Sequence, residues 1–265
     1  MTANMAEQPI LSIKNLKTYF YLAERTVKAV DGVNLDVYKG RVTAIVGGSG
    51  SGKSVMSLSI LNLIDPPGKI VDGEIWFNGV NLRILREQQL LTIRGKEISM
   101  IFQDPISAMN PVLKIKSHLF EVIHSHSRAI SNKEALCMSR DVLARVGLKS
   151  VDKILESYPF ELSGGMCQRV MVAMGVLAHS QVLIADEPTS SLDLTTQVAI
   201  LEELLRLRNE GMAVILITHD LGVVAQMADD VYVLKDGKIV DSGTVYDVFE
   251  SPKHEYTKSL LASIF

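Results

Sequence analysis

The sequence predicts an α/β protein with a parallel core sheet and an inserted α-helical subdomain. Three patterns indicate this class. From residue 163 onward, helical patterns alternate with short apolar strands, which is typical of a parallel sheet covered by helices. Earlier in the chain, a strand leads into a glycine-rich loop and then into a helix. Between these parts, residues 111–162 follow a helical pattern that interrupts the alternation.

The N-terminal part of the chain carries the signals of several strands and one helix. Alternation of apolar and polar residues predicts half-buried strands, and β-branched runs predict buried ones. The predicted strands are 11–16, 33–37, 41–46, 73–77 and 98–102. A helix over 54–63 is expected to end at Pro66-Pro67-Gly68, because proline and glycine break helices.

The C-terminal half is predicted to contain three strand–helix pairs after the helical stretch. The expected helices are 163–179, 195–209 and 221–228, and the expected strands are 181–185, 212–217 and 230–234. Within the helical stretch, Ser131 to Glu134 has the residue types of a helix N-terminus. We therefore expect one domain over residues 8–260, with a helical subdomain at about 111–180 inserted in its core.

Composition excludes several classes of protein. Among the 265 residues, 47% are hydrophobic and 22% charged, and the formal net charge is -3. A nucleic-acid partner is not expected, since such a partner requires a basic surface. The two cysteines, Cys137 and Cys167, do not form a metal-ligand pair, so a reducing compartment is expected. The longest apolar run is nine residues, Val170–Ala178, and a membrane span needs about 20. Any membrane role is therefore expected to depend on a partner.

A phosphate-binding loop is predicted between the strand 41–46 and the following helix. Its pattern is Gly47-Gly48-Ser49-Gly50-Ser51-Gly52-Lys53-Ser54, which matches G-x-x-x-x-G-K-[ST] in the required strand–loop–helix context. Glycines let backbone N–H groups approach phosphate oxygens, and the helix directs its positive end at the same anion. Lys53 would neutralise the β- and γ-phosphates, and Ser54 would offer its hydroxyl to Mg²⁺. The loop therefore predicts a nucleoside triphosphate as ligand.

Three more residues follow predicted core strands and have the chemistry of hydrolysis. Asp186 and Glu187 end the apolar strand 182–185, and His219 lies just beyond the strand 213–217. Asp186 is expected to bind Mg²⁺ through water. Glu187 is expected to act as general base or to polarise the attacking water. His219 would contact the γ-phosphate or that water.

The segment Leu162-Ser163-Gly164-Gly165-Met166 resembles the signature of ATP-binding cassette ATPases, and the resemblance covers nearly the whole chain. Gln103 resembles the Q-loop glutamine of that family, residues 190–193 (Ser-Ser-Leu-Asp) resemble its D-loop, and His219 resembles its switch histidine. The resemblance implies a P-loop NTPase (RecA-like) core with an antiparallel β subdomain at its N-terminus, and it implies ATP and Mg²⁺ as cofactors. It also implies that Gln103 acts in catalysis and binds Mg²⁺.

The resemblance further implies a head-to-tail dimer. Ser163, Gly164 and Gly165 are expected to open a helix whose hydroxyl and N–H groups contact the nucleotide held by the phosphate loop of the other subunit. An aromatic side chain near the N-terminus is expected to stack on adenine. Phe20 matches best, with Tyr19 and Tyr21 as alternatives.

Three longer segments look like the oligopeptide, dipeptide and nickel importer branch of this family: residues 103–111, 158–169 and 251–257. Gly48 and the lead-in 158–161 favour the nickel importer's ATP-binding protein. Peptide import is the alternative, and a cassette that acts outside transport is a more distant one. The branch implies two transmembrane permeases, a second homologous ATPase subunit in a heterodimer and an extracytoplasmic solute-binding protein. The expected location is the cytoplasmic face of the cell membrane, as a peripheral protein.

Two features invite a functional reading that the sequence does not favour. His118, His124 and His126 lie close together in the sequence and could suggest a nickel site. At about 100° per residue, however, His124 and His126 point to opposite sides of a helix. Cys167 departs from the arginine or leucine expected beside the signature, and a buried, inert thiol is the preferred interpretation.

Overall fold

A computed structural model describes residues 8–127, 129–190 and 192–262, and the chain divides into two compact units. The first unit holds the described residues up to Leu90 and those from Ala213 onward. The second unit is Leu91–Met212. Each unit contains strands and helices of the predicted α/β type.

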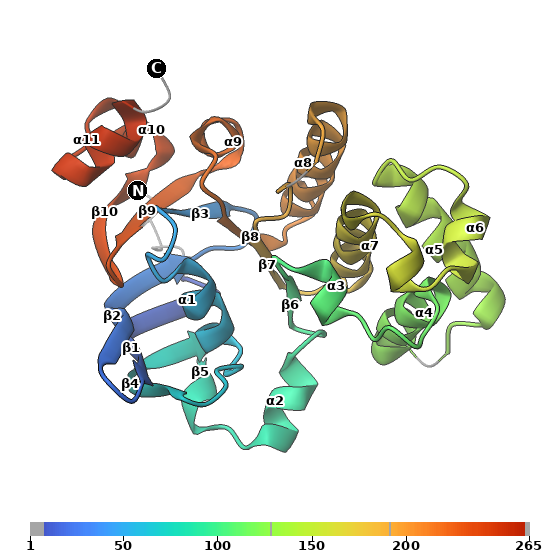
Figure 1. Cartoon of the computed structure of the whole chain (residues 1–265), viewed down its shortest axis with the longest axis horizontal. Helices are drawn as coiled ribbons and strands as arrows, with labels where there is room; N and C mark the ends of the chain where they lie inside the picture. The colour runs from blue at the N-terminus through green and yellow to red at the C-terminus, as the bar shows by residue number, and fades with distance from the viewer. Residues whose placement is uncertain (1–7, 128, 191, 263–265) are drawn as a thin grey trace, which may run out of the picture. The chain divides into compact units, whose positions relative to one another are not determined.

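The first unit begins with an antiparallel sheet, as predicted for the N-terminal subdomain. Strand β1 (Leu11–Tyr21) lies between β2 (Thr26–Val37) and β4 (Gly68–Phe77), and the short β5 (Val80–Asn81) pairs with β4 (Figure 1). The strands are longer than expected because pairing continues through polar and charged residues that carry no alternating pattern. Two short segments follow this sheet in the chain: η1 (Leu82–Ile84) and α2 (Glu87–Ile93).

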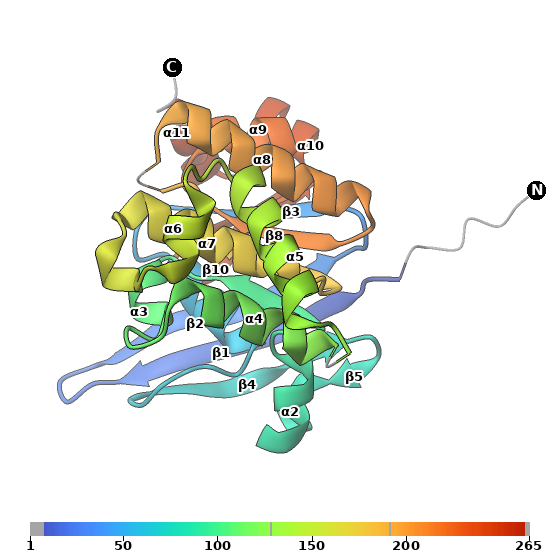
Figure 2. The same cartoon turned by 90° about the vertical axis from the view of Figure 1, so that its right-hand side faces the viewer.

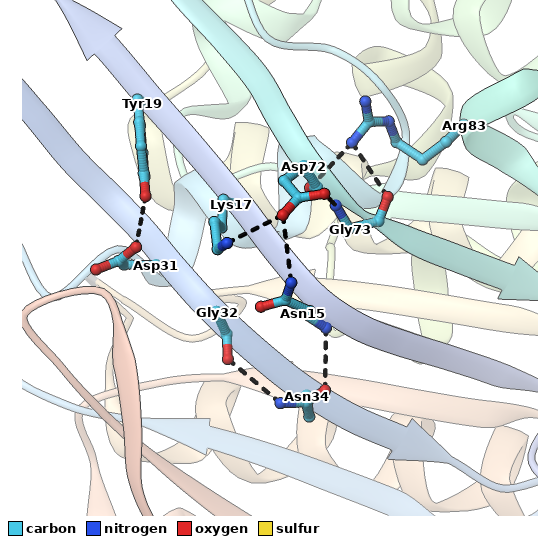
Figure 3. A network of polar contacts seen from close by, with 9 residues as sticks. All are labelled: Asn15, Lys17, Tyr19, Asp31, Gly32, Asn34, Asp72, Gly73 and Arg83. Carbon is cyan, nitrogen blue, oxygen red and sulfur yellow. Dashed lines mark hydrogen bonds and ion pairs between the residues drawn. The ribbon is translucent and has the colours of Figure 1, made fainter.

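A bulge in β1 shifts the alternation of buried side chains between residues 13 and 16. Buried side chains occur at positions 11, 13, 16 and 18, so the pattern changes phase once. Asn15 has a φ of 49° at this point, and a Cβ on the neighbouring Gly73 would lie 2.5 Å from the Cα of Leu16. The Nδ2 of Asn15 and the Nζ of Lys17 both donate to Asp72, at 3.3 and 2.9 Å (Figure 3). These polar contacts hold the bulge in place.

The core strands of the first unit form a mixed sheet. Strand β3 (Val42–Val46) lies between β8 (Ala213–Ile217) and β9 (Asp230–Lys235) and is parallel to both. Strand β10 (Lys238–Thr244), which was not predicted, is antiparallel to β9 and makes the predicted parallel sheet a mixed one. The reason is the two-residue turn Asp236-Gly237, in which both residues have positive φ, 48° and 76°. Such a turn joins antiparallel strands.

Four helices of the first unit accompany this sheet. They are α1 (Lys53–Ile60), α9 (Leu221–Met227), α10 (Val245–Glu250) and α11 (Glu255–Ala262). The last two follow β10 and were not predicted. Apolar side chains of α9, α10 and α11 pack with those of β3 and β9 in one cluster that includes Val46, Val224, Val233 and Val248. The C-terminal helices are therefore part of the core that supports β3.

The second unit contains two parallel strands and a group of helices. Strand β6 (Ile98–Ile101) pairs with β7 (Val182–Asp186). The predicted helical stretch consists of three helices and a short turn: α4 (Ile115–His126), α5 (Asn132–Arg145), α6 (Val151–Glu156) and η2 (Pro159–Glu161). Helix α5 begins at the predicted place, where Ser131 and Glu134 form a capping box. Helices α4 and α5 pack against each other and against α7 (Gly164–Leu177) (Figure 2).

Helix α7 contains the longest apolar run of the sequence and packs directly on the strands of its unit. A Cβ added to Gly175 would lie 2.9 Å from Ile101 and 3.4 Å from Leu183, so this glycine permits close approach of helix and sheet. Two further helices are α3 (Pro105–Ala108) and α8 (Leu194–Asn209). None of the helices in the described part of the chain has the length and apolar composition needed to cross a membrane.

Candidate nucleotide-binding site

The glycine-rich loop leaves β3 and enters α1, as the sequence predicts. At two positions of this loop there is no room for a side chain, so only glycine fits. A Cβ on Gly52, whose φ is 106°, would lie 2.0 Å from the carbonyl oxygen of Ala29. A Cβ on Gly47 would lie 2.2 Å from the carbonyl oxygen of Leu234. The loop is therefore packed tightly against backbone on one side, and any larger residue would force it to move.

The positive groups of the loop are already ordered. Lys53 is only 9% exposed, and its Nζ donates to the carbonyl oxygens of Gly47 and Gly48 at 2.8 and 2.9 Å. The N-cap residue of α1 is Gly52, which has no side chain to cap the first N–H groups of the helix. The buried Ser51 Oγ makes no hydrogen bond within the protein. A cation, a helix N-terminus and an unsatisfied hydroxyl in one loop fit a phosphate group.

His219 lies directly after β8, at the position expected from the sequence. Its side chain is exposed. The residues on both sides are fixed, because the Asp220 N–H donates to Thr218 Oγ1 at 3.0 Å and the Asp220 carboxylate accepts from the N–H groups of Gly222 and Val223. Asp220 is thus the N-cap of α9. This arrangement holds the backbone of His219 at the carboxyl end of a core strand.

The three aromatic candidates on β1 lie on two faces of the strand. Thr18 Oγ1 is 2.8 Å from Ser59 Oγ of α1, so Thr18 faces the helix that follows the phosphate loop. Phe20 shares that face because side chains alternate along a strand. A Cβ on Gly68 would lie 2.6 Å from the Phe20 ring. Tyr19 faces the other way and donates its hydroxyl to Asp31 at 2.6 Å (Figure 3).

The hydrogen bond of Tyr19 has an electrostatic consequence. Because Asp31 accepts from the hydroxyl, the pKa of Tyr19 is raised to about 12. The same bond holds the pKa of the Asp31 carboxyl below its ordinary value. Tyr21, which shares the face of Tyr19, is 52% exposed. Of the three rings, only Phe20 lies on the same face of β1 as Thr18.

In the second unit, two carboxylates end β7. Asp186 is the last residue of the strand and is 2% exposed, and Glu187 follows at 9%. The backbone of Glu187 has a φ of 50°, a conformation that few residues other than glycine adopt. Carboxylate oxygens are the donors that Mg²⁺ prefers, so this pair fits a magnesium ion of the kind that accompanies a triphosphate.

The turn that carries Glu187 is held by hydrogen bonds that the sequence analysis did not anticipate. The backbone N–H and the hydroxyl of Ser190 both donate to the Glu187 carbonyl, at 3.2 and 3.0 Å. The Nε2 of Gln168, a residue of α7 that is 3% exposed, donates to the Pro188 carbonyl at 3.2 Å. Only its position in the signature helix marks Gln168 in the sequence.

The signature segment begins α7, as predicted. Ser163 is the N-cap, and its Oγ accepts from the Met166 N–H at 3.3 Å. Ser163 and Gly164 are exposed, and Gly165 is half-buried. Gln103, the second residue after β6, is also exposed. These groups lie at the surface of the second unit.

The segment that resembles a D-loop is described only in part. Ser191 lies outside the described residues. Asp193 is the N-cap of α8. Its carboxylate accepts a hydrogen bond from the Thr196 N–H at 3.0 Å, and this bond lowers the pKa of the carboxyl.

The remaining candidates have structural contacts. Cys167 is fully buried, its Sγ donates to the Pro159 carbonyl at 3.3 Å, and burial raises the pKa of the thiol. This agrees with an inert thiol. The Nε2 atoms of His118, His124 and His126 lie within hydrogen-bond distance of three separate backbone carbonyls, those of Asn110, Ile130 and Gly95. No cluster of three or more His, Cys, Asp or Glu suited to a metal occurs among the described residues.

Comparison with known proteins places these features in a family. A family model described as ABC transporter matches residues 30–190. A solved structure, the dimeric post-hydrolysis state of the ATP-binding cassette MJ0796 bound to ADP and Pi, superimposes with a TM-score of 0.81 at 28% identity. The match covers 89% of this chain and 98% of that chain. The fold is therefore the P-loop NTPase fold of ABC ATPases, with an antiparallel sheet, a mixed core sheet and a helical insertion. The chain belongs to the ABC transporter family.

Several curated relatives align over almost the whole chain. The dipeptide transport ATP-binding protein DppD of Bacillus subtilis is 46% identical over 97% of this chain and 77% of its own length. The oligopeptide transport ATP-binding protein OppD of the same organism is also 46% identical, over 96% and 72%. The peptidoglycan transport ATP-binding protein YejF of Agrobacterium fabrum is 45% identical over 97% of this chain. This chain spans only 47% of that relative.

Proposed function

We propose that this chain is the ATP-binding subunit of an importer and that it hydrolyses Mg-ATP to drive uptake of peptides. The ordered phosphate loop supports the first part most directly. In that loop a nearly buried Lys53 is held by two loop carbonyls beside an uncapped helix N-terminus. The relatives named for dipeptide and oligopeptide transport support the second part.

In this proposal the residues of the first unit bind the triphosphate. The N–H groups of residues 49–54 and the Lys53 ammonium hold the β- and γ-phosphates. Ser54 contributes its hydroxyl to Mg²⁺, and His219 contacts the γ-phosphate. Phe20 stacks on adenine, because it shares the face of β1 that carries Thr18 toward α1.

The residues of the second unit supply the hydrolytic groups. Gln103 and, through water, Asp186 would hold Mg²⁺, which when bound would neutralise charge that develops on the phosphate oxygens. The Glu187 carboxylate accepts the proton of the attacking water. Glu187 is 9% exposed and its backbone carbonyl is held by Ser190, so the turn that carries the base is fixed in position.

The signature segment implies that the proposed ATPase acts as a dimer. Ser163, Gly164 and Gly165 contact the nucleotide of a second ATP-binding subunit in a head-to-tail dimer. Release of the γ-phosphate removes the charge that both subunits hold, so the dimer opens. Two permeases and a solute-binding protein complete the importer, with this chain as a peripheral subunit at the cytoplasmic face. A heterodimer with a homologous ATPase remains our preferred arrangement.

Peptides replace nickel as the favoured cargo. The sequence analysis favoured nickel because of Gly48 and the lead-in 158–161. The relatives with 44–46% identity that cover at least 96% of this chain carry names for dipeptide, oligopeptide or peptidoglycan transport. A residue of the phosphate loop contacts nucleotide rather than cargo, so it is a weak indicator of what the importer carries.

The test has two parts. Phosphate release by the purified chain, with Lys53→Ala as control, establishes hydrolysis, and turnover that is equal in both proteins would exclude the assigned site. Uptake by the reconstituted importer of di- and oligopeptides against Ni²⁺ then decides the cargo. ATP-dependent uptake of Ni²⁺ without peptide uptake would reverse the preference.

A further inference from the structure

The C-terminal helix α11 contacts the phosphate loop through one hydrogen bond. The backbone N–H of Gly48 donates to the Tyr256 hydroxyl at 2.7 Å, across 208 positions of sequence. The peptide that carries this N–H is the same one whose carbonyl, that of Gly47, accepts from Lys53 Nζ at 2.8 Å. The C=O and N–H of a trans peptide are rigidly coplanar and point in opposite directions. One peptide plane is therefore held at its two ends, by Lys53 and by Tyr256.

Tyr256 is itself fixed by contacts that leave its hydroxyl little freedom. Its ring lies under Lys235, whose Nζ is 4.9 Å from the ring centroid. Its backbone N–H donates to the His254 Nδ1 at 3.1 Å. The buried Asp241 carboxylate accepts from the N–H groups of Lys253 and His254, at 2.8 and 3.1 Å, and so anchors the turn before α11 to β10.

Electrostatics strengthen that anchor. Burial alone would raise the pKa of the Asp241 carboxyl, but the hydrogen bonds that it accepts, those from the N–H groups of His254, Lys253 and Ser242 among them, together hold the pKa below its ordinary value. Asp241 therefore stays ionised and keeps these N–H partners at neutral pH. The start of α11 is held to a strand of the core, and the Tyr256 hydroxyl is held with it.

The loop is shaped to receive this hydroxyl. Gly48 has no side chain, and a Cβ added there would lie 3.1 Å from the Tyr256 oxygen, closer than most carbon–oxygen contacts of this kind. A side chain at position 48 would therefore require the Tyr256 hydroxyl to shift by a few tenths of an ångström, and glycine avoids this shift.

We propose that Tyr256 is a positioning residue for ATP binding: its hydroxyl fixes the peptide 47–48, and that peptide orients the Lys53 ammonium toward the phosphates. This role rests on the proposed function, since it assumes that the loop binds ATP. Without the hydroxyl the peptide can rotate about its flanking bonds, and the Gly47 carbonyl, one of the two that hold Lys53, rotates with it.

The test is a double-mutant cycle on the affinity for ATP. Tyr256→Phe removes only the hydroxyl, and loss of one neutral hydrogen bond predicts an affinity for ATP that is weaker by about three- to ten-fold. In a Lys53→Ala background the same change is predicted to have no effect, because the group that it positions is gone. Binding is measured for all four proteins by titration with a fluorescent ATP analogue. Tyr246→Phe, a change in an exposed tyrosine of α10, is the matched control.

The outcomes separate this inference from the proposed function. If the unmodified chain does not bind ATP, the proposed function fails. If it binds ATP and Tyr256→Phe binds equally well, the positioning role is refuted. An equal loss of affinity in both backgrounds would also overturn it, since Tyr256 would then act without Lys53. Amide hydrogen exchange in the nucleotide-free, unmodified chain needs no variant. Protection of the Gly48 N–H is expected, and rapid exchange would contradict the inference.

Discussion

The turn that carries Glu187 depends on Gln168, and the substitution Gln168→Met tests this dependence. Methionine has nearly the same length and volume but no N–H donor. The Pro188 carbonyl, which is buried, then loses the donor that lies 3.2 Å away. Leaving a buried acceptor without its partner costs about 1–3 kcal/mol. For a chain of this size the melting temperature should fall by about 2–10 °C.

The catalytic effect should exceed the loss of stability. Glu187 touches the attacking water in the proposed mechanism, and Gln168 acts on it only through the turn. A displacement of about 1 Å in a catalytic group reduces the rate by up to about 100-fold. We therefore expect kcat to fall by about 10- to 100-fold, while the dissociation constant for ATP changes by less than about two-fold because Gln168 is remote from the phosphate loop in sequence and role.

The assay is steady-state phosphate release at a temperature well below both melting transitions, combined with direct ATP binding. Gln226→Met, a change at an exposed glutamine of α9, is the matched control and should leave both quantities unchanged. An unaltered kcat together with a lowered melting temperature would refute the reasoning, because Gln168 would then stabilise the fold without positioning Glu187.

Three further predictions concern single side chains. Lys53→Ala should weaken ATP binding by about 10- to 150-fold, since a charged hydrogen bond contributes about 1.5–3 kcal/mol; normal affinity by equilibrium binding would count against the assigned loop. Glu187→Gln should keep ATP binding but slow phosphate release by at least about 100-fold, and the variant should accumulate as a dimer, measured by light scattering. Unchanged turnover would show that Glu187 is not the general base. The raised Tyr19 pKa, from 10.0 to about 12, means that its bond to Asp31 stabilises the folded state fully below pH 10 and is lost as the pH rises toward 12. Tyr19→Phe should therefore flatten the alkaline loss of stability in urea titrations between pH 9 and 12, and an identical pH profile would show that the bond contributes nothing.

The nucleotide loop and the signature helix could be predicted because their determinants are local. Gly47 to Ser54 and Ser163 to Gly165 set the backbone at the place where they occur, so sequence spacing alone locates both. The capping box at Ser131 is local in the same sense and was also found. Motifs of this kind encode a turn, a helix start and a charge within a few residues.

The missed features are those that depend on distant partners. Strand β10 follows a turn at Asp236-Gly237 that the sequence shows, but its register depends on β9. The contact between Tyr256 and Gly48 joins residues 208 positions apart, and no pattern in either segment predicts it. Gln168 is hidden for the same reason, since its partner Pro188 lies in another element. The cargo could not be predicted reliably from the sequence, because in the proposed importer the permeases and the solute-binding protein select it.

The measurement that tests the central claim most directly is a crosslink between the phosphate loop and the signature segment. The exposed residues Ser49 and Ser163 are changed to cysteine in a chain that also carries Cys137→Ser and Glu187→Gln, and a short bis-maleimide is added with and without ATP. We predict a product of two chains that forms only with ATP, because in the proposed dimer each nucleotide is held by the loop of one subunit and the signature of the other. Crosslinks confined to single chains in the presence of ATP would contradict the account.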